Sequence, residues 1–265
     1  TCIHPQYISY LTYLYCTHPN PTHTSFQPVA LYNNNIWESP ALVRVTAWGT
    51  TFWILTELAR PERLFTFSSH SMSFQALVDA GFWQKNIVTE DSRIFLQCFL
   101  RYDGDYTVTP MYLPVSMDTA KADGYIESFK NLYKQQRRWA WGVEHFPYMV
   151  WHSRRNPRIP WRTKIRYVWN LGEGMYSWAS MPIVIFLLGR LPLYLAPESV
   201  RSLVIFQNLP FTLEWLMRFA MSGILLSAIL GFLLLPPHPK RARLWHMFVM
   251  MVQWVLLPVS LILFG

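Results

Sequence analysis

The feature that most constrains the fold of this chain is a change in its character near residue 170. Before this point charged and apolar residues are mixed, as in a globular domain, and after it long apolar runs dominate. A helix needs about 20 mostly apolar residues to cross the hydrocarbon core of a bilayer. The sequence therefore predicts a soluble part joined to a membrane part, in keeping with a hydrophobic content of 52%.

The apolar region is predicted to contain three membrane spans, at residues 175–197, 219–235 and 244–264. The first span is interrupted by two prolines and by Arg190, whereas the second is the cleanest. Residues 198–218 carry charges of both signs, which suits an interfacial or re-entrant segment. Residues 175–265 as a whole are predicted to form a transmembrane region.

Positive charge gathers directly before the first span. The net charge is +8, and the segment 151–174 holds a basic cluster of Arg154, Arg155, Arg158, Arg162, Lys164 and Arg166. Basic loops beside spans lie on the cytoplasmic side, and they also attract anionic headgroups. We therefore predict a basic juxtamembrane or interfacial segment at 151–174 and a multi-pass protein of the plasma or inner membrane with a cytoplasmic soluble part. Membrane lipids are the expected partner, and nucleic acid is not, because no docking motif accompanies the charge.

Residues 1–150 are predicted to alternate between helices and strands. Helices are expected at 7–16, 41–59, 74–80, 90–101 and 125–141, and strands at 27–32, 64–67 and 106–113. The helix at 41–59 is apolar but contains Arg44 and Glu57, so it is either buried or lies in the membrane interface rather than crossing the bilayer. Such alternation predicts an α/β fold.

One candidate catalytic motif is Thr89-Glu90-Asp91, at the start of a predicted helix. Thr89 is suited to cap this helix, and the helix dipole is expected to keep Asp91 ionised. A carboxylate fixed in this way could act as a general base. Alone, the triplet is better explained as a capping and dipole feature.

A second motif lies near the end of the helix at 125–141, in the run Gln135-Gln136-Arg137-Arg138-Trp139. Gln135, Arg138 and Trp139 fall on one broad helix face. An arginine and an amide there could bind a leaving diphosphate, and the indole ring offers a flat apolar surface to a sugar. An ordinary packing stripe is the alternative interpretation.

In this order, and followed by apolar spans, the two motifs resemble the TED and QxxRW motifs of membrane-bound family 2 glycosyltransferases, the group of cellulose, chitin and hyaluronan synthases. The resemblance covers roughly residues 1–145. It implies that 1–150 is part of a GT-A type nucleotide-sugar transferase domain, in an α/β fold followed by a transmembrane helical region. It implies an inverting hexosyltransferase that uses a nucleotide-diphosphate sugar, such as a UDP-sugar, and a glycan or glycolipid acceptor at the cytoplasmic membrane face.

The resemblance also assigns roles to residues. Asp91 would be the catalytic base, with Glu90 as its supporting neighbour. The acceptor and the diphosphate would be bound by a second set, comprising Gln135, Arg138, Trp139, Thr89 and His70. His70 follows Ser68-Ser69 in a polar turn that the family places beside the acceptor, although a structural histidine is an alternative. Gln27-Pro28 and Asn33–Asn35 could line the same site.

Enzymes of this family also use a DxD motif that holds a divalent cation, Mg²⁺ or Mn²⁺, against the donor diphosphate. Asp103-Gly104-Asp105 matches the pattern literally, but it follows Thr89-Glu90-Asp91, whereas the family's DxD precedes it. A glycine between two aspartates before a strand is typical of a turn. We therefore expect no metal ligands in this chain, a DxD motif upstream of Thr1, a missing N-terminal nucleotide-binding half, and no activity of the chain alone.

Two other functions remain open from the sequence. One is a non-catalytic polytopic membrane scaffold or transporter-like protein whose soluble part binds a partner. The other is a degenerate transferase that binds sugar nucleotides without turnover. Cys2, Cys16 and Cys98 are scattered and odd in number, which indicates neither a disulfide framework nor a zinc site.

Overall fold

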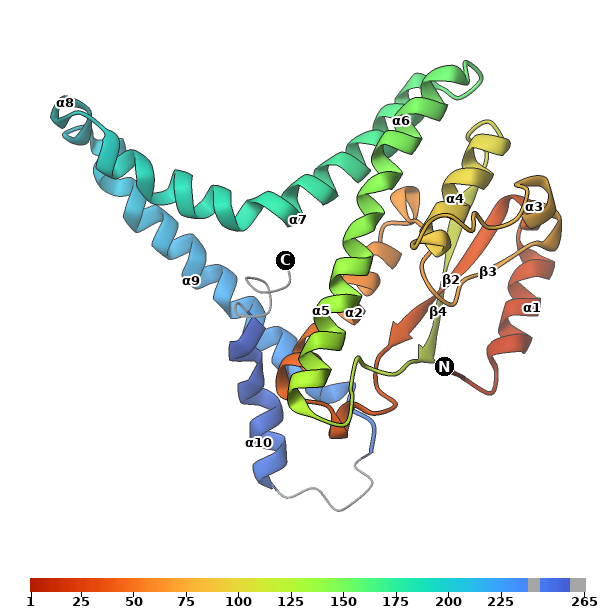
Figure 1. Ribbon diagram of the computed structural model, residues 1–265, viewed down its shortest axis with the longest axis horizontal. Helices are drawn as coiled ribbons and strands as arrows, with labels where there is room; N and C mark the ends of the chain where they lie inside the picture. The colour runs from red at the N-terminus through yellow and green to blue at the C-terminus, as the bar shows by residue number, and fades with distance from the viewer. Residues whose placement is uncertain (238–243, 258–265) are drawn as a thin grey trace. The chain divides into compact units, whose positions relative to one another are not determined.

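The computed structural model describes residues 1–237 and 244–257 (Figure 1). The chain divides into two compact units, Thr1–Glu173 and Gly174–Gly265. The first unit has a mixed α/β fold built on a four-stranded sheet. The described part of the second unit consists of helices and the short segments that connect them.

The sheet of the first unit is mixed and has the strand order β1-β4-β2-β3. Its strands are β1 (Cys2–Ile3), β2 (Thr24–Leu31), β3 (Ser71–Met72) and β4 (Thr107–Ser116). The long strands β2 and β4 are parallel, and the short strands pair antiparallel at the two edges. Because β2 is central and covered, its residues 24–30 are all buried.

An irregularity in the pairing of β2 with β4 explains where the strand prediction was wrong. Pro28 pairs with Met111, but the next residue, Val29, pairs with Pro114. Proline has no N–H to donate to a ladder and is tolerated at such irregularities. The strand predicted to end at Pro114 therefore continues to Ser116. The predicted strand at 64–67 is absent, because this segment bonds to a side chain of β2 rather than to its backbone.

Six helices complete the first unit before the long helix α7 (Trp161–Leu195) leaves it. They are α1 (Tyr7–Thr17), α2 (Ala41–Leu58), α3 (Phe74–Asp79), α4 (Glu90–Arg101), α5 (Tyr125–Ala140) and α6 (His145–Arg155). Figure 1 shows α1 along one side of the sheet and α2 with α5 along the other. The helix predicted at 41–59 is present as α2, and its burial settles the choice in favour of a core helix.

Apolar side chains pack on both faces of the sheet. The larger cluster joins β2 to α2 and α4, with Ile54, Phe95 and Phe99 at its centre. A smaller cluster places Tyr7 of α1 against Met111 and Val115 of β4. Burying a large apolar side chain stabilises a fold by about 1.5–3 kcal/mol. The sheet is therefore covered by apolar side chains on both faces.

The second unit contains α8 (Glu198–Arg201), α9 (Val204–Leu233), α10 (Leu244–Val252) and η5 (Gln253–Leu256). The break predicted between an interfacial piece at 198–218 and a span at 219–235 is wrong, because α9 runs through both and contains Pro210. Trp254 lies against Gly231, where an added Cβ would come within 3.0 Å of its ring. The glycine thus allows α9 and η5 to approach closely.

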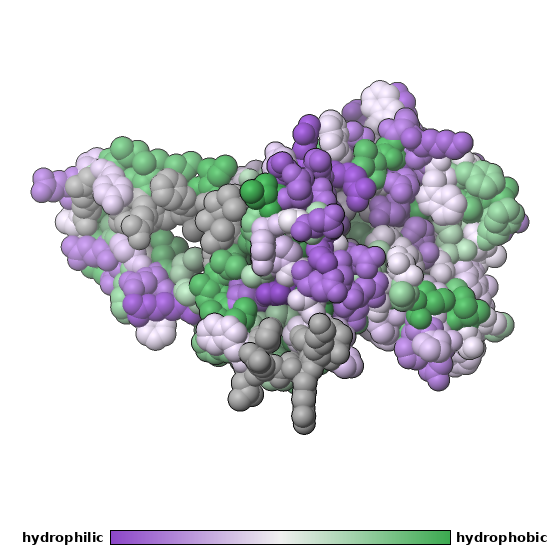
Figure 2. All heavy atoms as spheres, turned by 60° about the horizontal axis from the view of Figure 1, so that its bottom comes forward, coloured by the Kyte–Doolittle hydropathy of each residue, from purple (hydrophilic) through white to green (hydrophobic). Residues whose placement is uncertain are grey.

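Within the described residues, one helix is long and apolar enough to cross a bilayer, Phe206–Leu233 of α9. Figure 2 shows many hydrophobic residues at the surface of this unit. Phe219, Leu225 and Leu226 of α9 are exposed. The predicted span at 175–197 lies mostly in α7, which is not among the candidate spans found in the described residues. The predicted span at 244–264 extends into residues 258–264, which lie outside the described residues.

Candidate functional site

The first turn of α4 presents the Thr89-Glu90-Asp91 motif as predicted. Thr89 occupies the N-cap position and is buried, Glu90 is exposed and Asp91 is half-buried. The expected capping bond is absent, because within the described part of the chain the Thr89 hydroxyl has no hydrogen-bond partner. Asp91 is oriented instead by Ser92, whose backbone N–H donates to Asp91 Oδ1 over 2.8 Å.

The pKa of Asp91 differs in direction from the sequence-based expectation. Burial raises the pKa of this carboxyl, and Glu90 raises it further, against the lowering effects of Ser92 and His70. The dipole argument took no account of burial, which disfavours the charged form. A raised pKa brings the carboxyl closer to the pH at which a general base works best.

The loop at residues 64–72 lies next to Asp91 and is held by two buried polar side chains. Gln27 of β2 accepts a hydrogen bond from the Phe67 N–H over 2.7 Å and donates to the Ser68 carbonyl over 3.4 Å. Thr66 donates from its hydroxyl to the backbone carbonyl of Asp91 over 2.6 Å. Gln27 was predicted to line the site, but it is fully buried and acts from behind the loop.

The polar turn in this loop contains a left-handed residue, Ser69, with φ of 69°. His70 donates from Nδ1 to the Phe67 carbonyl over 2.8 Å, which favours the structural interpretation of this histidine. Burial lowers the pKa of His70, so the ring is neutral and Nε2 is a hydrogen-bond acceptor. Within the described residues, Nε2 has no partner.

Asp91 and this loop border a hollow of about 530 Å³, within the usual range of ligand sites. Its lining combines hydroxyl, imidazole, carboxylate and aromatic groups, and it consists of Ser68, Ser69, His70, Met72, Phe74, Leu77, Trp83, Glu90 and Asp91. We refer to it as the Asp91 hollow. Of the predicted site residues, it brings together His70, Glu90 and Asp91.

The Gln135–Trp139 motif borders a different hollow. Gln135 and Trp139 are half-buried and face α2 across a space of about 10 Å³, room for about one water molecule. Arg138 and Arg137 are exposed. Gln135 and Trp139 therefore line a different hollow from Asp91, because this face of α5 packs against α2.

Tyr32, which the sequence analysis overlooked, connects the two regions. Its ring is buried and lines the small hollow beside Gln135 and Trp139. Burial and then the charge of Asp91 raise the pKa of Tyr32, whereas Arg138 and a hydrogen bond with Ser68 lower it. Asp91 and Arg138 therefore act on the same phenol, and their effects on its pKa are opposite.

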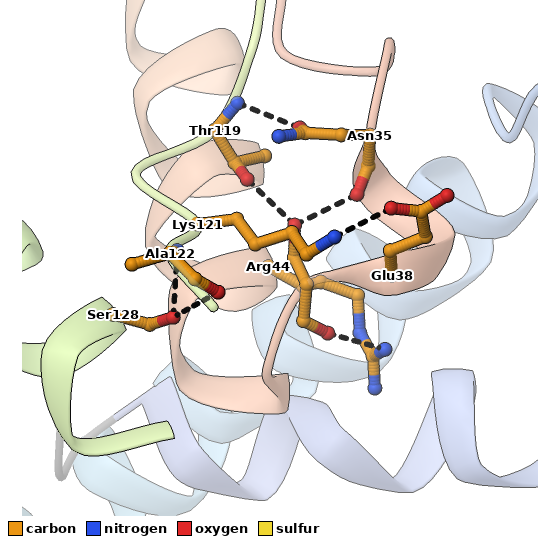
Figure 3. Close-up of polar contacts among 8 residues, drawn as sticks. Asn35, Glu38, Arg44, Thr119, Lys121, Ala122 and Ser128 are labelled. Carbon is orange, nitrogen blue, oxygen red and sulfur yellow. Dashed lines mark hydrogen bonds and ion pairs between the residues drawn. The ribbon is translucent and has the colours of Figure 1, made fainter. Parts of the chain in front are cut away.

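The loop that leads into α5 is fixed by a polar network with the segment before α2 (Figure 3). Asn35 Oδ1 accepts from the Thr119 N–H over 2.8 Å, and the hydroxyls of Thr119 and Ser39 are 2.6 Å apart. Lys121 pairs with Glu38 at 2.5 Å on the surface. Asn35 was predicted to line the site, but its role is to position the start of the helix that carries Arg138.

A second overlooked residue, Arg93, lies two residues after Asp91 on α4 and is buried. Its Nε donates to His145 Nδ1 over 3.1 Å, and its guanidinium lies 3.8 Å from the centre of the Tyr148 ring. Burial and the charge of Arg93 lower the pKa of His145 to about 4. This contact joins α4 to the segment that follows α5. An arginine among buried apolar positions of a helix was the signal for it.

The Asp103-Gly104-Asp105 segment forms the predicted turn between α4 and β4. Asp103 and Gly104 have φ values of 55° and 92°. Asp103 accepts hydrogen bonds from Asn156 and Arg158, and Asp105 pairs with His23. Among residues 1–237 and 244–257, no group of three or more His, Cys, Asp or Glu side chains is placed to hold a metal ion.

Comparison with known proteins gave no relative. No protein-family model, no curated protein and no solved structure matched the chain.

Proposed function

We propose that residues 1–150 belong to the catalytic domain of an inverting, membrane-bound family 2 glycosyltransferase of the GT-A type. The enzyme would transfer a hexose from a nucleotide-diphosphate sugar to a glycan or glycolipid at the cytoplasmic face of the cell membrane. The observation that supports this best is Asp91, a half-buried carboxylate with a raised pKa at the border of a ligand-sized hollow.

In the proposed reaction, the acceptor sugar lies in the Asp91 hollow. The Asp91 carboxylate takes the proton of the acceptor hydroxyl while that oxygen attacks the anomeric carbon of the donor. The bond from the anomeric carbon to the diphosphate oxygen breaks, and the nucleoside diphosphate leaves with the electron pair. Asp91 then releases its proton to water. General-base assistance of this kind contributes about 10²- to 10⁴-fold to a rate.

The donor diphosphate is assigned to Arg138, which is exposed and acts on the same phenol, that of Tyr32, as Asp91 does. A guanidinium can bind two phosphate oxygens at once, which stabilises the leaving group. Gln135 and Trp139 lie behind it at the small hollow and would hold α5 in place. The resemblance also implies a divalent cation beside the diphosphate, held by a DxD motif that precedes Thr89-Glu90-Asp91 in the family.

The membrane part is proposed to anchor this domain through several spans. The helix Phe206–Leu233 is the candidate that meets the length and composition required. The basic segment at 151–174 would then lie at the cytoplasmic surface, where anionic lipids attract it.

The test is a donor screen with the full-length protein in nanodiscs, with nucleoside diphosphate release as the readout. We expect release with one class of sugar nucleotide, and a decrease of roughly 10²- to 10⁴-fold in Asp91→Asn. The matched control is Asp105→Asn, an exposed carboxylate of the turn after α4, which should leave the rate unchanged.

Two outcomes would contradict the proposal. If no sugar nucleotide releases its diphosphate, the enzyme interpretation fails and the membrane scaffold remains. If Asp91→Asn turns over as fast as the wild type, Asp91 is not the base.

A further inference from the structure

The aromatic side chains at the Asp91 hollow differ from those that the sequence motifs suggest. Trp139, the aromatic residue of the second motif, lines the small hollow instead. The aromatic rings at the Asp91 hollow belong to Phe74 and Trp83. Trp83 is 40% exposed and Phe74 is 72% exposed, so both offer ring surface to a ligand.

The position of Trp83 is fixed by a defined turn. Helix α3 ends with a hydrogen bond from the Phe82 N–H to the Leu77 carbonyl and another from Gly81 to Val78, the pattern of a Schellman motif. Both Gly81 and Phe82 have positive φ, 78° and 66°. The chain therefore reverses immediately before Trp83.

This turn is also fastened to the helix that carries Asp91. The Gln97 side chain donates from Nε2 to the Phe82 carbonyl over 2.9 Å and to the Ala80 carbonyl over 3.2 Å. Gln97 lies on α4, the same helix that presents Asp91 at its start. One rigid element thus sets the separation between Trp83 and Asp91.

The other groups around this hollow suit a sugar ring. A pyranose presents an apolar face of C–H groups and a rim of hydroxyls, so it needs a flat apolar surface together with several polar partners. The indole of Trp83 provides the apolar surface. The carboxylate of Asp91 and the hydroxyls of Ser68 and Ser69 provide the polar partners. His70 also lines this hollow, and its Nε2 is buried without a partner among the described residues.

We infer that a pyranose ring of the glycan acceptor stacks on Trp83 in the Asp91 hollow. The inference rests on the proposed transferase function for the role of the ring as acceptor. Trp83 is a positioning residue, because it orients the hydroxyl that Asp91 deprotonates. Phe74, at the open rim, extends the same apolar surface.

The kinetic test uses the full-length protein in nanodiscs and the sugar nucleotide that supports turnover, with a panel of short gluco-, galacto- and N-acetylglucosamine oligosaccharides as acceptors. In Trp83→Ala the acceptor KM should rise roughly tenfold, which is the loss expected for one aromatic contact. The donor KM and the slow hydrolysis of the donor by water should not change. Trp83→Tyr should restore most of the acceptor affinity.

Trp151→Ala is the matched control, since Trp151 is a 56% exposed tryptophan on α6 that does not line the hollow. Trp139→Ala separates the two hollows. If Trp139→Ala raises the acceptor KM and Trp83→Ala does not, the inference is overturned.

A binding test does not depend on turnover. The protein is labelled with 5-fluorotryptophan, and the Trp83 signal in ¹⁹F spectra is assigned through Trp83→Tyr. We expect this signal to move on addition of one of the oligosaccharides, while the Trp151 signal stays in place. A Trp83 signal that no oligosaccharide moves, but that spin-labelled lipid broadens, would assign this surface to the membrane and overturn the inference.

The two tests separate the inference from the proposed function. If no sugar nucleotide is turned over but the Trp83 signal responds to an oligosaccharide, the transferase proposal fails and a carbohydrate-binding hollow remains. If turnover depends on Asp91 and Trp83 responds to no oligosaccharide, the transferase proposal stands and the stacking role of Trp83 is wrong.

Discussion

The hydroxyl of Thr66 donates a hydrogen bond of 2.6 Å to the backbone carbonyl of Asp91. Thr66 is fully buried, in the loop that also carries His70. The bond ties the loop to the first turn of α4, so the two walls of the Asp91 hollow are held by one contact. The position of the proposed base is therefore set by tertiary structure as well as by its helix.

We expect Thr66→Val to lower both the free energy of unfolding and the transfer rate of the protein that remains folded. The isosteric valine removes the donor but fills the same space, so the free energy of unfolding should fall by about 1–3 kcal/mol. The transfer rate of the folded protein should fall as well, because Asp91 loses its fixed position. Diphosphate release and thermal unfolding would be measured side by side. Thr66→Ser keeps the hydroxyl and should behave as the wild type; equal losses in both variants would contradict the role of the bond.

The raised pKa of Asp91 predicts an acid limb in the pH dependence of transfer. Asp91 must be ionised to accept a proton, so kcat/KM should fall as the pH drops through its raised pKa. Ser92→Ala removes a hydroxyl that lowers this pKa, and the acid limb should therefore move to higher pH. The measurement is a pH–rate profile of both proteins. A limb that stays in place or moves to lower pH would argue against Asp91 as the titrating group.

His145 predicts a separate pH effect on stability. Its pKa is lowered to about 4 in the fold, so the unfolded chain binds a proton first as the pH falls below about 6.5. The free energy of unfolding should decrease between pH 6.5 and pH 4, by up to about 3 kcal/mol. Chemical unfolding of the detergent-solubilised protein at several pH values measures this.

The control for this effect is His145→Asn, whose side-chain oxygen can still accept the hydrogen bond from Arg93. This variant should show a weaker loss of stability in acid than the wild type, because residue 145 no longer titrates. The same acid dependence in both proteins would show that another group is responsible.

The network before α5 predicts a contrast between two substitutions. Asn35→Ala leaves the buried N–H of Thr119 without a partner, which should cost about 1–3 kcal/mol. Lys121→Ala breaks only a surface ion pair with Glu38, which is worth about 0–1 kcal/mol. Thermal or chemical unfolding compares the two. A larger loss in Lys121→Ala would mean that the surface pair, rather than Asn35, holds the loop.

Local features of this chain could be predicted from its sequence. The start of α4 at Glu90, the end of α3 at Gly81 and the turn at Asp103-Gly104-Asp105 all depend on residues within a few positions of each other. Glycine at the C′ position is favoured by short-range sterics, and Thr89 lies at the N-cap as expected, although it does not make the capping bond. These predictions were correct in position.

Features set by packing between distant segments could not be predicted. The face of α5 that carries Trp139 could have met either hollow, and only its contact with α2 decides which one. The same limit applies to the pKa of Asp91, which is raised by burial in the folded chain. The loop at residues 64–72, which lies next to Asp91, is about 20 residues earlier in the sequence. Arg93 and Tyr32 were overlooked for this reason, since their partners are far apart in sequence.

The side chain of Gln27 has a consequence for how the loop beside Asp91 is built. A carboxamide has the same donor and acceptor as a peptide group, and Gln27 offers both to the backbone at Phe67 and Ser68. It thereby substitutes for a neighbouring strand, without requiring the loop to extend as a strand would. The loop keeps its main-chain bonds satisfied and can still reverse at Ser69. Glutamate at this position could not donate and asparagine would be too short, so the shape of the hollow's wall depends on one amide.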